Sequence, residues 1–385
     1  MTREKAAGHS IILFHIFSPG QFQFIAGIHS HLCLKRQQVI CYLYCEQASS
    51  TLGGDLGFDD LHCLSTMKTE ELDEVNIFIQ TEIYARGPQE AIRIFVGHGQ
   101  PNKVTNWSSE NLRAVDAYFL YGPLELEMFT EIRSHYPTDC DHIQIYEAGY
   151  PKLDDQINGR YNREQILEEL KLDPSLKTVI YAPAWDPGGA LSTFGTDLID
   201  MLKQIPDINV IVKLRPASME APESDYFSFY TGGVNWKEEL QHYNSHARVS
   251  FVEDHLINPL LFVSDLMVTD FSGVALEFMT LKRPVLFLDC PEFYEKTLVE
   301  WQQDPEKAKN DDRFNGGRNY GQVVYDIGNL ASTVVHHIRN PEELSAKSQD
   351  MAQRFLYNPG KGGEVSAALI LEILTSKITH HRINE

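Results

Sequence analysis

The feature that most constrains the fold of this chain is its series of short, unbroken apolar runs, separated by segments with helical periodicity. Runs such as VICYLYC at residues 39–45 and VLFLD at residues 285–289 contain few polar residues. Such runs suit parallel strands that are buried on both faces, whereas a strand with one wet face alternates apolar and polar residues. The helical segments between them, including residues 163–171 and 274–282, indicate β-α-β units. The pattern predicts an α/β fold with two doubly wound domains that face one another across a central cleft.

A break at Gly149-Tyr150-Pro151 separates two series of predicted strands. We predict Rossmann-like domains over residues 1–155 and 156–357. A C-terminal helix is predicted over residues 358–385. One possible arrangement packs this helix back against the N-terminal domain. In such sheets, ligands bind beyond the carboxyl ends of the strands. Strands are predicted at residues 11–17, 39–45, 75–80, 92–96, 117–121, 143–147, 178–182, 210–214, 249–252, 266–269, 285–289 and 323–326.

The charge and the hydropathy of the chain exclude several classes of partner. It has 54 acidic residues against 33 basic ones, a formal charge of −21. Such a surface repels nucleic acid and disfavours binding to anionic lipid through a polybasic patch. No apolar segment approaches the roughly 20 residues that span a bilayer.

The six cysteines form no CxxC pair, and those in VICYLYC are expected to be buried free thiols. We therefore expect a cytoplasmic protein, with at most peripheral contact to the inner face of the membrane.

The strongest local signal is the strand-turn-helix-strand pattern of residues 266–289. Ser272 stands where a helix N-cap belongs, and Gly273 would let a ligand approach the backbone. The N-terminus of a helix favours an anion, so a nucleotide phosphate would fit there. The alternative is that Asp270 and Ser272 only cap the helix. Glu277 would accept hydrogen bonds from ribose hydroxyls, although an exposed glutamate on a helix fits the spacing equally well.

A second signal is the glycine-bracketed histidine in residues 92–103, IRIFVGHGQPNK. His98 follows an apolar strand, and a side chain at the carboxyl end of a parallel strand points toward the crevice. Imidazole exchanges protons near neutral pH and so suits a general base, which typically contributes about 10²–10⁴ in rate. The alternative is an ordinary loop histidine, since the chain has 15 histidines.

A third signal is VIVKLRP at residues 210–216, where a strand ends in two basic side chains. Strand alternation would place Lys213 and Arg215 on one face, where both would meet a diphosphate. The alternative is a solvated pair at the end of a strand. Motifs of other enzyme classes are absent from the sequence, among them GxxxxGK[ST], HExxH and GxSxG.

Taken in order, these motifs resemble the CDP-glycerol glycerophosphotransferase family, whose members build and prime teichoic-acid-like polymers of glycerol phosphate. The resemblance covers roughly residues 90–375 and is most specific at residues 264–277. The matching segments are His98-Gly99-Gln100-Pro101 with Lys103, Tyr181-Ala182-Pro183 with Trp185, Lys213-Leu214-Arg215-Pro216, and SDLMVTDFSGVALE at residues 264–277.

The resemblance implies a GT-B architecture, with the acceptor on the side of the N-terminal domain and the donor nucleotide mainly on the C-terminal domain. It implies CDP-glycerol as the donor substrate and a glycan or lipid-linked acceptor, with no cofactor; the need for a divalent metal is left open. His98 becomes the candidate base, with Arg215 as a second catalytic candidate. The candidate donor contacts are Lys213, Arg215, Thr269, Asp270, Ser272, Gly273 and Glu277, and Gly99 and Lys103 are candidate contacts to acceptor or phosphate.

Two positions depart from the family pattern. Arg215 replaces a usual histidine, and Gly273 replaces a second serine. Arginine cannot exchange a proton at neutral pH, but it binds phosphate in bidentate fashion. We therefore expect transfer of glycerol phosphate to a hydroxyl of a cell-surface polysaccharide or teichoic-acid-like polymer, with release of CMP. Two alternatives stay open: a GT-B glycosyltransferase or epimerase that uses a nucleotide sugar, and a non-catalytic nucleotide-binding protein of the same pathway.

Overall fold

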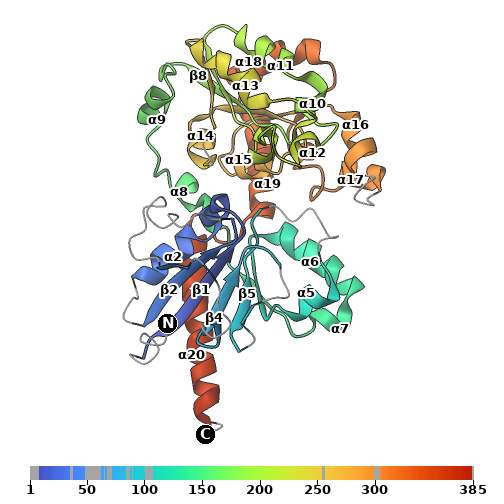
Figure 1. Cartoon of the computed structure of the whole chain (residues 1–385). Coiled ribbons are helices and arrows are strands. Elements are labelled where there is room, and N and C mark those ends of the chain that lie inside the picture. Colours follow the sequence, from blue (N-terminus) through green and yellow to red (C-terminus); the bar gives the residue numbers. More distant parts are fainter. Residues whose placement is uncertain are drawn as a thin grey trace. The chain divides into compact units, whose positions relative to one another are not determined.

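The computed structural model describes residues 8–34, 38–47, 62–64, 66, 72–83, 87–88, 90–99, 107–253, 256–298 and 304–383. The chain divides into two compact units (Figure 1). Unit 1 comprises Met1–Asp154 and Phe355–Glu385, and unit 2 comprises Asp155–Arg354. Each unit contains one parallel sheet with helices around it, which confirms the predicted α/β class.

The sheet of unit 1 has the strand order β3-β2-β1-β4-β5-β6-β7, and all of its pairings are parallel. The central strand β1 pairs with β2 from Ser10 opposite Val39 to Ile16 opposite Cys45. Its side chains from Ile11 to Phe14 are fully buried, as expected for a strand covered on both faces. The strands are β1 (Ser10–Ile16), β2 (Val39–Cys45), β3 (His62–Leu64), β4 (Ile77–Gln80), β5 (Ile92–Phe95), β6 (Ala117–Leu120) and β7 (Gln144–Glu147).

The sheet of unit 2 repeats the plan with six strands, in the order β10-β9-β8-β11-β12-β13. These pairings are also all parallel. The strands are β8 (Lys177–Tyr181), β9 (Ile208–Val212), β10 (Val249–Phe251), β11 (Leu266–Thr269), β12 (Val285–Leu288) and β13 (Gln322–Val324).

Every strand predicted from an apolar run is present, with ends that differ by at most one or two residues. The strand β3 was not predicted, because it has only three residues, two of them with exposed side chains, and therefore lacks the apolar signal. One shifted end matters for the site: β9 ends at Val212 rather than at Leu214. Of the cysteines, Cys41 and Cys45 are buried free thiols as predicted, whereas Cys63 is exposed.

Helices surround each sheet and occupy the loops that follow its strands. In unit 1 they are η1 (Pro19–Phe24), α2 (Ala26–Cys33), α5 (Ser109–Arg113), α6 (Pro123–His135), α7 (Pro137–Cys140), η3 (Pro151–Leu153) and α20 (Gly362–Ile383), and α8 (Asp154–Ile157) begins at the last residue before unit 2. In unit 2 they are α9 (Arg163–Glu169), α10 (Ala190–Phe194), α11 (Asp197–Lys203), η4 (Pro216–Met219), α12 (Phe227–Thr231), α13 (Trp236–Gln241), η5 (His242–Ser245), α14 (Asn258–Val263), α15 (Val274–Met279), α16 (Pro291–Phe293), η6 (Tyr294–Leu298), α17 (Pro305–Asn310), η7 (Arg318–Tyr320), η8 (Ile327–Asn329), α18 (Leu330–Arg339) and α19 (Glu342–Phe355).

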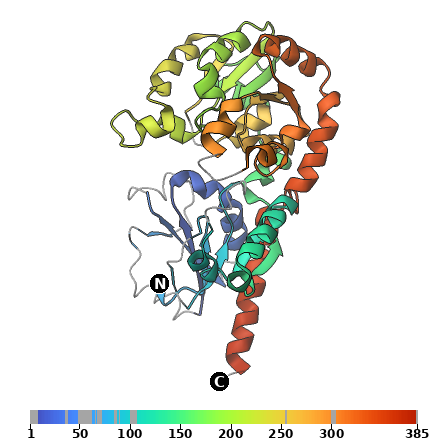
Figure 2. The same cartoon turned by 90° about the vertical axis from the view of Figure 1, so that its right-hand side faces the viewer.

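The C-terminal helix α20, red in Figure 2, packs against α2 of unit 1. Its first turn is held by Asp154, whose two carboxylate oxygens accept the backbone N–H groups of Gly362 and Gly363 at 2.9 and 2.8 Å. A negative charge at this position also complements the helix dipole. A Cβ on Gly363 would lie 2.7 Å from the carbonyl carbon of Gly27, so the two helices can meet this closely only with glycine there.

None of the helices in the described part of the chain is long and apolar enough to cross a membrane.

Candidate functional site

The predicted site residues follow strands that lie at or beside the point where the strand order of each sheet reverses. Numbered from its own first strand, each sheet reads 3-2-1-4-5-6, and unit 1 adds a seventh strand. The reversal therefore lies between β1 and β4 in unit 1 and between β8 and β11 in unit 2. Ligands of open α/β sheets bind at such switch points, beyond the carboxyl ends of the strands.

In unit 1, His98 lies three residues beyond the end of β5, and its side chain is 43 % exposed. Its Nδ1 lies 2.8 Å from the backbone carbonyl oxygen of Thr81, the residue that follows β4. A carbonyl can only accept, so Nδ1 carries the proton and Nε2 of the neutral ring is left as the acceptor. This is the tautomer that a general base needs.

A carboxylate lies beside the same ring nitrogen. Oε1 of Glu82 is 3.4 Å from Nδ1 of His98 and accepts a hydrogen bond of 2.7 Å from the side-chain amide of Gln21. Gln21 is buried and in turn accepts from the hydroxyl of Thr81 and from the backbone N–H of Phe17. The loops after β1 and β4 thus hold the glutamate in place, and its charge would stabilise a protonated imidazole.

Sequence reasoning missed Gln21 and Glu82, because neither forms a local motif with His98. The signal that could have found them is their position: each follows an apolar strand, and β1 and β4 are neighbours only in the folded sheet.

The glycines around His98 have different roles. Gly97 has φ of +68°, and a Cβ there would meet the hydroxyl of Tyr121 at 3.1 Å, so both conformation and space favour glycine. Gly99 has φ of +148°, and a Cβ there would meet no heavy atom of the described residues within 4 Å, so only its conformation requires glycine. Lys103, predicted as a contact to acceptor or phosphate, lies outside the described residues.

In unit 2, two of the predicted donor contacts are used within the protein. The hydroxyl of Thr269, at the end of β11, donates to the carbonyl of Ala182 at 2.7 Å. The carboxylate of Asp270 accepts the backbone N–H groups of Ala184 and Ala190 at 2.8 and 2.7 Å. Both side chains are fully buried. In this structure they hold the loop after β8 against β11, and their predicted contacts to the donor stay predictions.

The close fit around Asp270 extends to Gly189, where a Cβ would lie 2.8 Å from one carboxylate oxygen. Burial raises the pKa of Asp270, although backbone N–H groups that donate to the carboxylate, including those of Ala190 and Ala184, oppose this shift. Thr269 and Asp270 thus join the end of β11 to the loop after β8 through buried hydrogen bonds.

The start of α15 differs from the prediction. Gly273 is the N-cap, with φ of −59°, and no side chain caps the helix, so Ser272 does not act as the N-cap. Any residue can adopt the φ of Gly273, so the backbone conformation does not explain why glycine stands here in place of the family's second serine. Glu277 is 6 % exposed, which excludes the alternative of an exposed glutamate on the helix surface.

Strand alternation predicted that Lys213 and Arg215 share one face, but in the structure one is buried and the other is exposed. Because β9 ends at Val212, both lie beyond the strand. Lys213 is buried, and its Nζ donates to the carbonyl of Leu214 at 2.6 Å. Arg215 is exposed and immediately precedes η4. Of the two, Arg215 presents its charge to solvent.

An aromatic group lies beyond the carboxyl end of β8. Trp185 lies 5.5 Å from Phe229 and 4.9 Å from Tyr230, measured between ring centroids. Phe229 is 57 % exposed, so part of this group faces solvent. Its position, in the loop that Asp270 holds, fits stacking of a base on Trp185 as well as simple loop packing.

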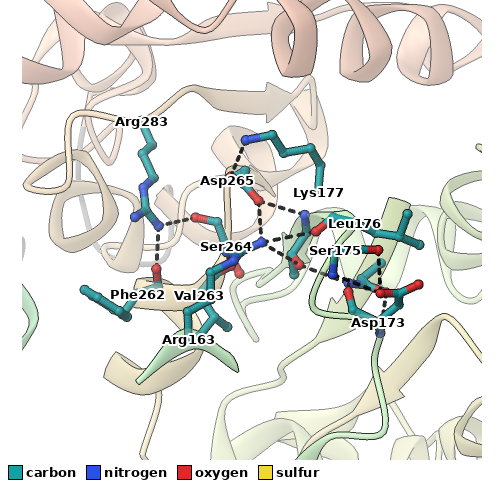
Figure 3. Close-up of polar contacts among 12 residues, drawn as sticks. Arg163, Asp173, Ser175, Leu176, Lys177, Phe262, Val263, Ser264, Asp265 and Arg283 are labelled. Carbon is teal, nitrogen blue, oxygen red and sulfur yellow. Dashed lines mark hydrogen bonds and ion pairs between the residues drawn. The ribbon is translucent and has the colours of Figure 1, made fainter. Parts of the chain in front are cut away.

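The start of the most specific motif, Ser264-Asp265, has a structural role (Figure 3). Asp265 pairs with Arg163 and Lys177, each at 3.0 Å. Arg163 and Arg283 also donate to carbonyls at the C-terminal end of α14, among them those of Val263 and Phe262. The last carbonyls of a helix have no partner within it, so these arginines satisfy them. This cluster fixes α14 against β8 and the turn before β12, and places β11.

Comparison with known proteins gives a family match. Residues 108–297 match the family model of CDP-Glycerol:Poly(glycerophosphate) glycerophosphotransferase. The chain is similar to the teichoic acid poly(glycerol phosphate) polymerase of Staphylococcus epidermidis, with 29 % identity over 157 residues, which is 38 % of this chain and 19 % of the relative. Alignments cover between 18 % and 39 % of the length of the curated relatives.

Solved structures show the same fold. The wall teichoic acid polymerase TagF superposes with a TM-score of 0.67 at 16 % identity, over 96 % of this chain and 90 % of that chain. A putative UDP-N-acetylglucosamine 2-epimerase from Listeria monocytogenes superposes with a TM-score of 0.60 at 14 % identity, over 96 % and 97 % of the two chains. At these identities the likeness concerns the fold, and it confirms the GT-B-type class.

Proposed function

This chain belongs, through residues 108–297, to the CDP-glycerol:poly(glycerophosphate) glycerophosphotransferase family, and we propose on that premise that it transfers glycerol phosphate from CDP-glycerol to an acceptor hydroxyl. The products would be CMP and a surface polymer extended by one glycerol phosphate. The observation that carries the proposal is the family match. The arrangement around His98 gives it independent chemical support, since the loops of unit 1 hold that imidazole in the tautomer of a base.

In the proposed reaction, Nε2 of His98 accepts the proton of the acceptor hydroxyl. The hydroxyl oxygen attacks the β-phosphorus, to which glycerol is attached, and the bond from that phosphorus to the oxygen of CMP breaks. The protonated ring keeps its Nδ1–H on the carbonyl of Thr81, and Glu82 at 3.4 Å offsets the new positive charge. Catalysis of this kind rests on positioning and on charge stabilisation.

The donor would be held by unit 2. Arg215 is the exposed cation beyond β9 and would contact the diphosphate, where a guanidinium binds phosphate oxygens in pairs. Ser272 and Gly273, before α15, would contact the same group, and Glu277 would accept from the ribose. Lys213 would act through its charge from a buried position. Thr269 and Asp270 would support the site by holding the loop after β8.

The acceptor would be a glycan or a lipid-linked polymer of the cell envelope, because the family name and the relatives' names concern glycerol phosphate polymers. We place the protein in the cytoplasm, at the inner face of the membrane when the acceptor is lipid-linked. With 54 acidic residues against 33 basic ones, attachment to anionic lipid through its own charge is disfavoured, so the acceptor or a protein partner would bring it there.

The deciding experiment measures CMP release by the purified protein from CDP-glycerol, with CDP-ribitol and UDP- and CMP-linked sugars in parallel and a mixed pool of glycan acceptors. Release of CMP from CDP-glycerol with glycerol phosphate on the acceptor is the expected result. Turnover of a nucleotide sugar alone would transfer the function to a GT-B glycosyltransferase or epimerase. Tight binding of CDP-glycerol without turnover on any acceptor would identify a binding protein, the alternative that Arg215 and Gly273 motivate.

A further inference from the structure

Three side chains that bind metals lie together in unit 2, where α18 ends and α19 begins. His336 and His337 are in the last turns of α18, and Glu343 is in the first turn of α19. Nε2 of His336 lies 2.8 Å from Oε2 of Glu343, and Nδ1 of His337 lies 4.0 Å from the same oxygen. One ligand atom from each residue falls within 4.8 Å of the other two. α18 ends at Arg339 with Asn340 as its C-cap, and α19 begins two residues later, at Glu342.

The tautomer of His337 suits a ligand. Its Nε2 lies 2.5 Å from Oε1 of Gln322 on β13, and an amide oxygen can only accept, so the ring proton is on Nε2. Nδ1 is then an unprotonated nitrogen that points toward Glu343. The side chain is 3 % exposed, and this atom has no hydrogen-bond partner among the residues that the structure describes. Histidine ligands of metals are commonly oriented in this way, by a hydrogen bond to the other ring nitrogen.

An ordinary ion pair does not account for this arrangement. A pair between His336 and Glu343, both about half exposed, would be complete without His337 and would leave its buried Nδ1 unsatisfied. In a tetrahedral zinc site, with bonds of about 2.0–2.2 Å, neighbouring nitrogen and oxygen ligands lie about 3.3 Å apart. Small rotations of the two exposed side chains would bring the observed separations of 2.8 and 4.0 Å to that value. A surface hollow lined by Gln322, Ser332, Thr333 and His336 lies beside the cluster.

We propose that His336, His337 and Glu343 form a binding site for a divalent transition-metal ion, with Zn²⁺ the best match to two imidazoles and one carboxylate. Three protein ligands leave a fourth position for water or for a group from a partner. The bound ion would join the end of α18 to the start of α19, and so stabilise unit 2. The proposal does not depend on the proposed transfer reaction, because none of its residues belongs to the candidate site.

The test titrates Zn²⁺ into the full chain, prepared without a histidine tag, against a chromophoric chelator. Glu343→Gln and His336→Ala each remove one exposed ligand, and Glu342→Gln is the matched control, since Glu342 is the exposed neighbour of Glu343 in the same turn. We expect one ion per chain in the parent and in the control, and at least about tenfold weaker binding in both ligand variants. Zn²⁺ should raise the melting temperature of the parent and of Glu342→Gln, but not that of Glu343→Gln or His336→Ala.

Co²⁺ gives a second readout, because a tetrahedral site with mixed nitrogen and oxygen ligands produces intense visible bands that loosely bound ions do not. The bands should appear in the parent and be lost in Glu343→Gln. Equal Zn²⁺ affinity in the parent and in both ligand variants would overturn the proposal, and so would a parent that leaves the chelator fully loaded. Circular dichroism of the metal-free variants checks that they are folded, which keeps lost binding distinct from lost structure.

Discussion

The two units share a strand order but use the polar residues at their switch points differently. In unit 1, the loops after β1 and β4 hold an imidazole that stays 43 % exposed, with Gln21 and Glu82 behind it. In unit 2, the loops after β8 and β11 hold a carboxylate, Asp270, that is fully buried and bound to backbone N–H groups of the opposite loop.

A switch point can therefore present a reactive group or shape a binding surface, depending on what its polar side chains contact. An exposed ring with a fixed tautomer can exchange protons with a ligand. A buried carboxylate whose oxygens accept backbone N–H groups sets the shape of the loops around it. The division fits a base on unit 1 and donor binding on unit 2, and each of the following experiments tests one side of it.

Replacing His98 by alanine should have the largest effect. Without the base, CMP release from CDP-glycerol should fall by about 10²–10⁴-fold, the usual contribution of general base catalysis. His135→Ala is the control, since His135 is an exposed histidine of the same unit on α6. Wild-type turnover in His98→Ala would show that the exposed imidazole of unit 1 is not the base.

Replacing Asp270 by asparagine should destabilise unit 2. An amide offers one oxygen for two backbone donors, so either Ala184 or Ala190 loses its partner in a buried place. A buried group left unsatisfied costs about 1–3 kcal/mol. Urea unfolding measures the change, with Asp197→Asn as a control on the exposed first turn of α11. If both variants unfold at the same urea concentration, the hydrogen bonds of Asp270 to Ala184 and Ala190 do not stabilise unit 2 as described.

Unit 1 also buries a carboxylate, Glu125 on α6, which accepts from the hydroxyl of Tyr118 and the backbone N–H of Tyr121. Burial raises its pKa from 4.5 to about 8. The folded state thus keeps a proton that the unfolded state releases above pH 4.5. Stability from this group is present below pH 4.5 and lost as the pH rises through 8, by about 1 kcal/mol per pH unit within that window.

Glu125→Gln replaces the carboxyl by a neutral amide, so this slope should disappear. Urea unfolding of the parent and the variant at pH 5.5, 6.5 and 7.5 measures it, and the variant should gain on the parent at each step. Parallel pH dependence of the two proteins would mean that Glu125 is already ionised in the fold, and that its burial does not raise its pKa.

Glu82→Gln should have the smallest effect. The amide can still accept from Gln21, but it no longer offsets the charge on a protonated His98. Partly exposed ion pairs are worth up to about 1 kcal/mol, so kcat should fall by about fivefold with the KM for the donor unchanged. In a His98→Ala background the same change should have no further effect. Additive losses in the double variant would show that Glu82 acts independently of the imidazole.

The local pattern of residues was enough to predict the strands, the α/β class and the family. Apolar runs and helical periods are properties of neighbouring residues, so β1, β2 and β11 could be read directly, whereas the short, exposed β3 could not. The family motif at residues 264–277 was equally readable, because it is contiguous.

Only the tertiary structure decided what the motif residues contact. Asp270 and Asp265 look alike in one motif, yet the first binds backbone N–H groups of the loop after β8, and the second pairs with Arg163 and Lys177. The partners of His98 come from loops that are distant in sequence and become neighbours through strand pairing. Periodicity determines which residues are buried, because burial follows from local geometry and hydropathy. Which polar groups meet depends on sheet order and on where each strand ends, and both are settled by packing over the whole unit.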